Sequence, residues 1–367
     1  MWAGSRISSG KNYNHVLLPF GSLFPIPSDG RRRPEETLID PEKTFFHKRV
    51  LVTGGLGFIG SNLAQRLVRF GADVFLVDSL IPEYGGNLFN IEGIRDRVRV
   101  NISDVRDEHS MKYLLQGQDY LFNLAGQTSH MDSMQDPYTD LEINCRAQLS
   151  ILEACRKHNP SVKIVFASTR QIYGKPEYLP VDEKHLLRPV DVNGINKMAG
   201  EWYHILYNNV YGIRSCALRL TNTYGPRMRV KDARQTFLGI WVRLLVEGKP
   251  FEVWDGEQLR DFTHIDDAVD ALLLAAANDA GNGQAFNLGG ECAISLTDLA
   301  SLLVDANGGG EYMVRSFPED RKRIDIGDYF ADDRLIRKVL GWDPKVPLRE
   351  GLASTLAYYR ANLKHYL

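Results

Sequence analysis

A glycine-rich turn followed by an acidic residue is the first feature of the sequence that could do chemistry. Gly54, Gly57 and Gly60 follow the apolar residues 50–52, and Asp78 ends a second apolar run eighteen residues after Gly60. Glycine at these places permits a tight reversal, close approach of a pyrophosphate, and close packing of a helix on the strand. A helix that begins here would direct free N–H groups at the phosphates. Because a carboxylate at Asp78 would bind a ribose diol and repel a 2′-phosphate, the spacing predicts a site for NAD rather than NADP.

Alternating apolar and amphipathic segments must position these residues. Apolar runs predict strands at residues 50–52, 74–77, 98–100, 120–126 and 163–167, and helical periodicity occurs at residues 61–68 and 137–157. This alternation predicts an α/β fold with a doubly wound parallel sheet, the Rossmann architecture, whose ligands bind beyond the carboxyl ends of the strands. Asp104 follows one of the strands. It could bind an adenine amino group, and it could equally cap a helix.

The composition excludes several classes of function. Of 367 residues, 44% are hydrophobic and 25% charged, which excludes a wholly disordered chain. Lys and Arg number 44 and Asp and Glu 46, so the net charge is −2 and offers no basic field for nucleic acid or an anionic membrane. No apolar run is long enough for a membrane helix. The widely spaced cysteines indicate no metal site and no disulfide framework, so we expect a soluble protein of a reducing compartment, the cytoplasm; they are Cys145, Cys155, Cys216 and Cys292.

The first 47 residues differ from the rest. They are rich in Ser, Gly, Pro and Asn, lack sustained periodicity, and contain no apolar segment suited to a signal peptide. We therefore expect residues 1–47 to form a poorly structured extension.

Five motifs in one order carry a resemblance to a known family. They are TGGLGFIG (53–60), LAGQTSHMDSMQDP (124–137), ASTRQIYG (167–174), LRLTNTYGPR (218–227) and RDFTHIDD (260–267). In this the chain resembles the extended short-chain dehydrogenases/reductases, in particular the NAD-dependent nucleotide-sugar epimerases and dehydratases of the UDP-glucose 4-epimerase type. The resemblance implies an NAD-binding domain over residues 48–180 and a smaller sugar-nucleotide domain over residues 181–367, interleaved with the last strands of the sheet. It also implies that NAD oxidises a sugar carbon of a nucleotide-diphosphate sugar to a ketone and later returns the hydride.

The same resemblance implies which residues form the site. Thr169 takes the place of the hydroxyl that hydrogen-bonds the reacting oxygen, and Lys197 that of the lysine that holds the nicotinamide ribose and lowers the pKa of a nearby base. Beyond the glycine turn and Asp78, the implied cofactor contacts are Phe58, Ile59, Asp104, Val105, Leu124, Ala125 and Lys197. The implied substrate contacts are Ser133, Asn222, Arg260 and Arg323. Arg260 could instead pair with Asp261 or Asp267.

One position departs from the family. Asn193 stands four residues before Lys197, where the family has a tyrosine, and an amide cannot accept the alcohol proton. Three explanations stay open. Proton transfer could come from His130, Asp191 or, through a water, Thr169; the protein could bind NAD and a sugar nucleotide without turnover; or it could deliver hydride to an already oxidised 4-keto sugar. Of these groups, His130 has the ordinary pKa best suited to proton transfer near neutral pH. A single histidine on a loop is equally often a hydrogen-bonded surface group.

A second departure concerns the choice of reaction. Arg170 and Gln171 stand where the family's 4,6-dehydratases have an acidic pair that removes water, and neither can protonate a leaving hydroxyl. Dehydration is therefore disfavoured. We expect epimerisation of a nucleotide-diphosphate sugar at C4 through a keto-sugar, with a non-standard acid/base. The alternatives are a non-catalytic NAD- and sugar-nucleotide-binding protein, and a 4-keto-sugar reductase or dehydratase variant.

Apolar residues on two expected helices concern the oligomeric state. At spacings of three and four, helices over residues 137–157 and 197–210 carry Leu149, Leu152, Met198, Trp202, Ile205 and Leu206. In the family such helices form a four-helix dimer contact, so we expect a homodimer. Core packing within one chain would give the same pattern.

Overall fold

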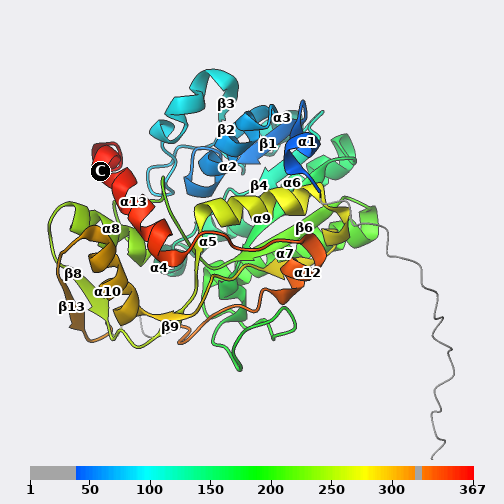
Figure 1. The fold of residues 1–367 in the computed structure, drawn as a ribbon. Helices are drawn as coiled ribbons and strands as arrows, with labels where there is room; N and C mark the ends of the chain where they lie inside the picture. Colours follow the sequence, from blue (N-terminus) through cyan, green and yellow to red (C-terminus); the bar gives the residue numbers. More distant parts are fainter. Residues whose placement is uncertain (1–38, 319–324) are drawn as a thin grey trace, which may run out of the picture. The chain divides into compact units, whose positions relative to one another are not determined.

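A parallel sheet of seven strands organises the chain (Figure 1). The computed structural model describes residues 39–318 and 325–367. The strand order is β11–β6–β5–β4–β1–β2–β3, and every neighbouring pair is parallel. The strands are β1 (Arg49–Thr53), β2 (Asp73–Asp78), β3 (Val98–Ile102), β4 (Tyr120–Asn123), β5 (Lys163–Thr169), β6 (Ser215–Leu220) and β11 (Ala285–Asn287). Because the chain winds outward from β1 in both directions, the expected doubly wound sheet is confirmed.

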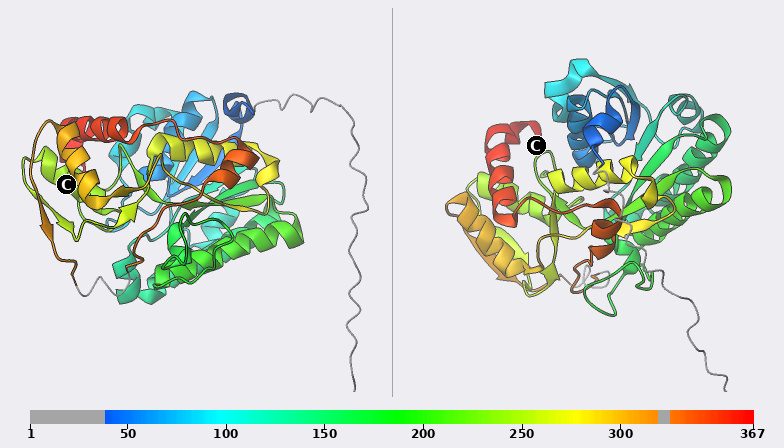
Figure 2. Two further views of the ribbon diagram at one scale, coloured as in Figure 1. Left: turned by 60° about the horizontal axis from the view of Figure 1, so that its bottom comes forward. Right: turned by 45° about the vertical axis from the view of Figure 1, so that its right-hand side comes forward.

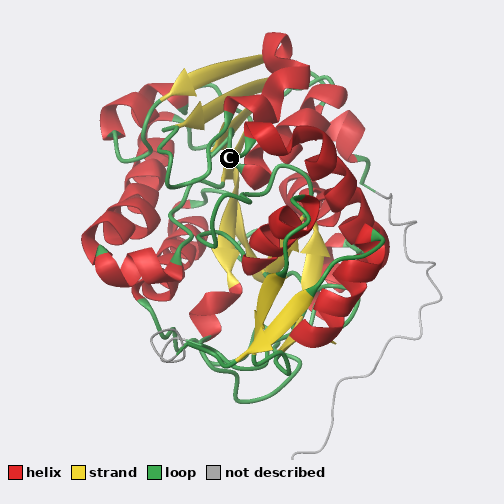
Figure 3. Ribbon diagram, turned by 90° about the vertical axis from the view of Figure 1, so that its left-hand side faces the viewer, coloured by secondary structure: helices red, strands yellow, loops and turns green. Residues whose placement is uncertain are grey.

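Helices cover both faces of this sheet (Figures 2 and 3). Successive side chains of a strand point to opposite faces, so Val50 and Val52 of β1 pack in one hydrophobic cluster and Leu51 in another. Helices α2 (Phe58–Arg69) and α9 (Ile265–Ala277) are among those that pack in the first cluster. Those in the second are α3 (Glu108–Leu114), α6 (Ala147–His158) and α7 (Val192–Tyr211). Across the described residues, no helix combines the length and apolar character that a membrane span needs.

Two expected helices differ from the sequence prediction in detail. The helix expected over residues 137–157 consists of α5 (Pro137–Leu141), a π-helical segment η2 (Glu142–Arg146) and α6. The helix expected from Lys197 begins earlier, because the Asp191 side chain accepts a hydrogen bond from Gly194 N at 2.6 Å and caps α7. Periodicity located both helices but not the π-helical segment, and it placed the start of α7 too late because it did not include the local cap by Asp191.

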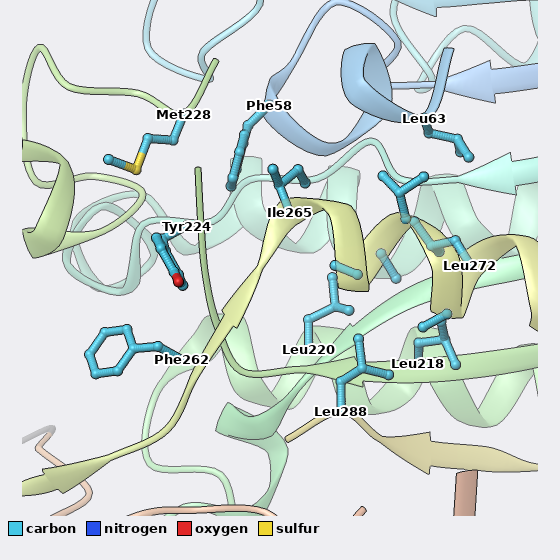
Figure 4. Packing of buried hydrophobic residues seen from close by; sticks show 14 of the residues in the cluster. Phe58, Leu63, Leu218, Leu220, Tyr224, Met228, Phe262, Ile265, Leu272 and Leu288 are labelled. Carbon is cyan, nitrogen blue, oxygen red and sulfur yellow. The ribbon is translucent and has the colours of Figure 1, made fainter. Parts of the chain in front are cut away.

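The second half of the chain adds strands β6 and β11 to the main sheet and also forms a smaller lobe. In this lobe β7 (Asn222–Tyr224) pairs with β10 (Phe262–His264), β8 (Phe251–Trp254) with β13 (Tyr312–Arg315), and β9 (Leu259–Arg260) with β12 (Ile294–Ser295). Its helices α8 (Phe237–Val246), α10 (Leu296–Asn307) and α13 (Leu348–Asn362) gather on the left of Figure 1. Leu63 and Leu218 share one buried cluster with Tyr224 and Phe262 (Figure 4), so both halves pack in a common core.

Shorter elements connect these layers. They are α4 (His130–Gln135), α12 (Arg334–Leu340), and the 3-10 turns η1 (Leu88–Arg97), η3 (Arg170–Tyr173), η4 (Asp279–Gly281) and η5 (Leu363–His365). Of these, α4 and η3 follow the carboxyl ends of β4 and β5, where a parallel sheet binds its ligands.

The start of the folded chain differs from the expected boundary. Up to residue 38, the extension expected over residues 1–47 lies outside the described residues. Its last part forms α1 (Pro41–Phe45), capped by the Asp40 side chain, which accepts a hydrogen bond from Glu42 N at 3.1 Å. The Phe45 ring is fully buried 4.9 Å from the ring of Tyr120 and 6.1 Å from that of Phe122. Because Phe45 fills a place in the core, residues 41–45 belong to the fold.

Candidate functional site

A cavity of about 890 Å³ lies beyond the carboxyl end of β5 and is lined by residues of both halves of the chain. This volume is typical of small-molecule sites. The expected site residues in its lining are Phe58, Ile59, Leu124, His130, Thr169, Asn193, Lys197, Asn222 and Arg260. Among the described residues, the expected ones outside the lining are Gly54, Gly57, Gly60, Asp78, Asp104, Val105, Ala125 and Ser133. Arg323 lies outside the described residues.

The glycine turn has the geometry that a dinucleotide phosphate site needs. Gly54 has a φ of +67°. A Cβ at Gly60 would lie 2.2 Å from the Gly54 carbonyl oxygen, so glycine lets α2 begin close to β1. No side chain caps α2 at Gly57, which leaves the first N–H groups of the helix available to an anion. The turn therefore fits a diphosphate.

Asp78 is held beside this turn, and Asp104 is paired with an arginine. The two carboxylate oxygens of Asp78 accept hydrogen bonds from Leu56 N at 3.0 Å and Leu80 N at 2.9 Å, and burial raises the pKa of this carboxyl. Each oxygen keeps acceptor capacity for a ribose hydroxyl. Asp104 pairs with the Arg106 guanidinium at 2.6 Å. The alternative that Asp104 caps a helix is wrong, because Asp107 caps α3.

Thr169 and Ser168 are adjacent but differ in what they can bind. Thr169 lines the cavity, and its hydroxyl accepts a hydrogen bond from Gln171 N at 3.3 Å. The Ser168 hydroxyl donates to Glu201 at 2.6 Å, and Glu201 pairs with Arg219 at 2.5 Å inside the protein. Thr169 is thus the hydroxyl of this pair available to a ligand, while Ser168 anchors the end of β5.

Lys197 lies at the floor of the cavity. Its ammonium group donates a hydrogen bond to Ala167 O at 3.1 Å and lies 4.9 Å from the centre of the Phe166 ring. Burial lowers the pKa of Lys197 to about 8. A Cβ at Gly126 would lie 2.9 Å from the ammonium nitrogen, so glycine leaves room for it.

Asn193 is engaged in a buried network. Its amide nitrogen donates to Gln127 O at 2.8 Å and to the Asp140 carboxylate at 3.0 Å. Asn144 and Asn196 also donate to Asp140, at 3.0 and 2.8 Å. Three amide groups therefore surround this buried carboxylate. At the position where the resembling family has a tyrosine, the amide nitrogen of Asn193 is therefore hydrogen-bonded within the protein.

Ser133 belongs to the same buried network. Its hydroxyl donates to His130 O at 2.7 Å and accepts from Asn193 N at 3.2 Å, and the residue is fully buried. Ser133 was an expected substrate contact, but it does not line the cavity. Its hydroxyl is hydrogen-bonded to His130 O and Asn193 N instead.

His130 is paired with a buried carboxylate. His130 Nδ1 lies 2.9 Å from the Asp191 carboxylate and 3.4 Å from Gln171 Nε2. Burial alone would raise the pKa of Asp191, but the hydrogen bonds from His130, Gly194 and Gln171 outweigh it and the pKa is lowered. Asp191 is thus a carboxylate that orients the imidazole and would stabilise its protonated form. His130 is not a lone surface group, since it lines the cavity beside this partner.

Arg170 and Arg260 line the cavity together with Asn222. The amide nitrogen of Asn222 donates to Asp261 O at 2.9 Å, and its oxygen accepts from Arg170 Nη2 at 3.2 Å. Arg260 donates to Gly327 O at 2.5 Å and pairs with Asp325 at 3.3 Å. The ion pair suggested with Asp261 or Asp267 is therefore formed with Asp325 instead.

Sequence reasoning missed the residues that support these groups. Gln127 lies in the motif of residues 124–137, but no sequence pattern singled out Gln127, Asp140 or Asn144 as partners of Asn193. The hydrogen bonds of Asn193 to Gln127 and Asp140 span 66 and 53 residues. The pairing of His130 with Asp191 likewise joins α4 to the start of α7. Only the fold brings these side chains together.

Comparison with known proteins identifies similar chains. Residues 50–289 match the model of the NAD dependent epimerase/dehydratase family. The chain is 31% identical over 316 residues to a putative UDP-glucose 4-epimerase of Methanocaldococcus jannaschii, with 85% of this chain and 99% of that protein covered. The crystal structure of UDP-glucose 4-epimerase from Thermotoga maritima with UDP-glucose has a TM-score of 0.79 at 31% identity and covers 86% of this chain and 99% of that chain. The UDP-glucose 4-epimerase of Thermus thermophilus in complex with NAD has a TM-score of 0.76 at 29% identity, with 86% and 99% covered. These matches confirm the resemblance carried by the five motifs.

Proposed function

The chain belongs to the NAD dependent epimerase/dehydratase family, and from this premise we propose that it epimerises a nucleotide-diphosphate sugar at C4, with His130 as the acid/base. The observation that carries the proposal is the His130–Asp191 pair on the same cavity as Thr169 and Lys197. Asn193 cannot take up a proton as the family's tyrosine would, and His130 supplies a titratable group on the same cavity.

The residues present fit NAD, the cofactor of the family. The glycine turn and the uncapped start of α2 would hold its diphosphate, Asp78 its adenine ribose, and Lys197 its nicotinamide ribose. When bound, NAD would accept a hydride from the sugar carbon and return it. The Thermus thermophilus relative was solved with NAD, which supports this assignment.

The chain's own residues then handle the proton. Thr169 would hydrogen-bond the reacting oxygen, and His130 would take its proton during oxidation and return it during reduction. Asp191, held at the start of α7 by Gly194 N, would keep the imidazole oriented and stabilise its charged form. Arg170 stands where a dehydratase has an acidic side chain, so the site offers no general acid there to expel water.

Exchange of single side chains tests this assignment. In NAD-loaded protein given UDP- and dTDP-sugars, His130→Gln should lower kcat by about 10²–10⁴-fold, which is the usual contribution of a general acid/base. Asp191→Asn should lower kcat and shift its pH profile, because the imidazolium loses its carboxylate. NMR detection of the epimeric sugar measures turnover, and calorimetry checks that NAD binding is retained. His109→Gln, at an exposed position on α3, is the matched control and should keep full turnover.

Two outcomes would contradict the proposal. Full turnover of His130→Gln would remove His130 from the mechanism. A folded wild-type protein that binds both NAD and a nucleotide sugar but produces no epimer would favour the non-catalytic alternative. That outcome separates a binding protein from an enzyme.

We further propose a homodimer formed through α7. Trp202, Leu206 and Val210 share one face of this helix and are 53%, 48% and 60% exposed. Neighbouring α5 exposes Tyr138 and Leu141. Apolar side chains so arranged on packed helices favour a second copy of the chain as the occupant. Of the other residues in the expected dimer pattern, Leu152 is fully buried within its own chain, and Leu149, Met198 and Ile205 are partly buried.

A further inference from the structure

Arg170 lines the cavity with an incomplete set of partners. Its Nη2 donates to Asn222 Oδ1 at 3.2 Å, and its guanidinium lies 5.1 Å from the centre of the Tyr329 ring. Its Nη1 is buried and has no hydrogen-bond partner among the described residues. A guanidinium presents five N–H donors, and within the described part of the chain only Asn222 accepts a hydrogen bond from Arg170.

Other arginines around the cavity have carboxylate partners. Arg260 pairs with Asp325 at 3.3 Å, Arg234 with Asp132 at 2.8 Å, and neither leaves a buried nitrogen unpartnered in the described part of the chain. Asp261 lies close enough to Arg170 to act on its charge, but its carboxylate oxygens accept from Thr221 and from Ala331 N. Burial lowers the pKa of Arg170, yet a guanidinium stays protonated at neutral pH. A positive charge is therefore held at the cavity wall with no ion-pair partner among residues 39–318 and 325–367.

The place of Arg170 indicates which part of a ligand would meet this charge. Arg170 directly follows Thr169, so their Cα atoms are about 3.8 Å apart. Under the proposed function Thr169 contacts the reacting oxygen of the sugar. A group bound by Arg170 would therefore sit on or close to the sugar ring, whereas the glycine turn, which would hold the cofactor, lies at the end of β1.

We propose that Arg170 binds a carboxylate carried by the sugar, so that the preferred substrate is a nucleotide-diphosphate uronic acid. This inference rests on the proposed function. A carboxylate matches the planar fork of a guanidinium, and the buried Nη1 supplies a donor that the protein leaves unused. The inner phosphate of the diphosphate has related chemistry and is the other source of an anion that the test must separate.

Binding to NAD-loaded protein provides the test. UDP-glucuronate and UDP-glucose share the nucleotide and the diphosphate and differ in the carboxylate, and dTDP-glucuronate and dTDP-glucose form a second such pair. For at least one pair, calorimetry should show wild-type protein binding the uronate about 10-fold or more tightly than the neutral sugar, because hydrogen bonds to charged groups are the strong ones. Arg170→Gln should weaken uronate binding by about 10–100-fold and neutral-sugar binding by less than about 3-fold. Arg170→Lys, which keeps the charge but loses the fork, should lie between them.

A matched variant controls for the charge itself. Arg234→Gln removes a positive charge from the same cavity, but that guanidinium already pairs with Asp132. The ratio of uronate to neutral-sugar affinity should change by less than about 3-fold in this variant. Circular dichroism of each variant confirms that it is folded.

The outcomes separate this inference from the proposed function. Equal losses of uronate and neutral-sugar binding in Arg170→Gln would assign Arg170 to the diphosphate and overturn the inference. Wild-type protein that binds both sugars equally would also overturn it, while leaving epimerisation intact. Failure of folded, NAD-loaded protein to bind any of the four nucleotide sugars would overturn both proposals.

Discussion

Asn193 replaces the tyrosine of the family, and its side chain is hydrogen-bonded within the protein. A tyrosine at this position would offer a hydroxyl to the ligand, whereas the amide nitrogen of Asn193 donates to Asp140 and Gln127. Asp140 is fully buried, and amide donors are what allow such a carboxylate to be accommodated. Under the proposed function the acid/base comes from another element, and His130 on α4 lines the same cavity. The single change at residue 193 is therefore understood only together with its partners.

The buried ammonium group of Lys197 leads to a prediction about pH. Burial lowers the pKa of Lys197 from 10.5 to about 8, so between these values the unfolded chain binds more protons than the folded one. The free energy of unfolding of wild-type protein without NAD should therefore rise with pH relative to that of Lys197→Met, by roughly 2–4 kcal/mol between pH 7 and pH 10.5. Below about pH 7 the difference should be constant, because the lysine is then largely charged in both states. Urea unfolding of both proteins at several pH values measures this difference in the free energy of unfolding. A difference that does not vary between pH 7 and pH 10.5 would show that folding does not lower the pKa of Lys197.

At the scale of elements, the contact between α2 and β1 depends on Gly60. A Cβ there would lie 2.2 Å from Gly54 O and 2.9 Å from Gly54 C, and backbone atoms cannot rotate away as a side chain can. Gly60→Ala should therefore move the start of α2, weaken NAD binding by 10-fold or more, and lower the free energy of unfolding by about 1–3 kcal/mol. Calorimetry with NAD and denaturant unfolding measure the two effects.

Gly93→Ala is the control for this change. A Cβ at Gly93 would meet nothing within 4 Å, so the variant should keep its NAD affinity and change the free energy of unfolding by less than about 0.5 kcal/mol. If Gly60→Ala binds NAD as tightly as Gly93→Ala does, the close approach of α2 to β1 is not what forms the diphosphate site.

The same elements show what the sequence could and could not predict. Local patterns predict the glycine turn and the succession of the first five strands along the chain. These patterns are glycines at fixed spacing and apolar runs such as residues 50–52. Helix α1 was missed because Phe45 has no periodic neighbours, and its burial depends on Tyr120 in β4. The π-helical segment η2 was missed because it has the composition of an ordinary helix.

At the scale of the whole molecule, the sequence alone did not predict how the residues of the candidate site contact one another. The resemblance to the family located Thr169 and Lys197, and their roles at the site stay a prediction. The pair of His130 with Asp191 and the hydrogen bond of Arg170 to Asn222 join segments that only the folded sheet brings together. The motifs therefore marked positions such as Thr169 and Asn193, whereas the contacts of these side chains required the structure.

The last prediction concerns the assembly of two whole chains. Leu206 lies between Trp202 and Val210 on the exposed face of α7, and all three are about half exposed in the single chain. If this face is the dimer contact, Leu206→Asp places a charge in its apolar centre and should weaken dimerisation by about 30-fold or more, the effect of losing an interface hot spot. Light scattering across a dilution series should then show wild-type protein at twice the chain mass where the variant is monomeric. Val314→Asp, at an equally exposed apolar position on β13, should remain dimeric. A wild-type protein that is monomeric at every concentration would contradict the homodimer, and a dimer unaffected by Leu206→Asp would place the contact on another face.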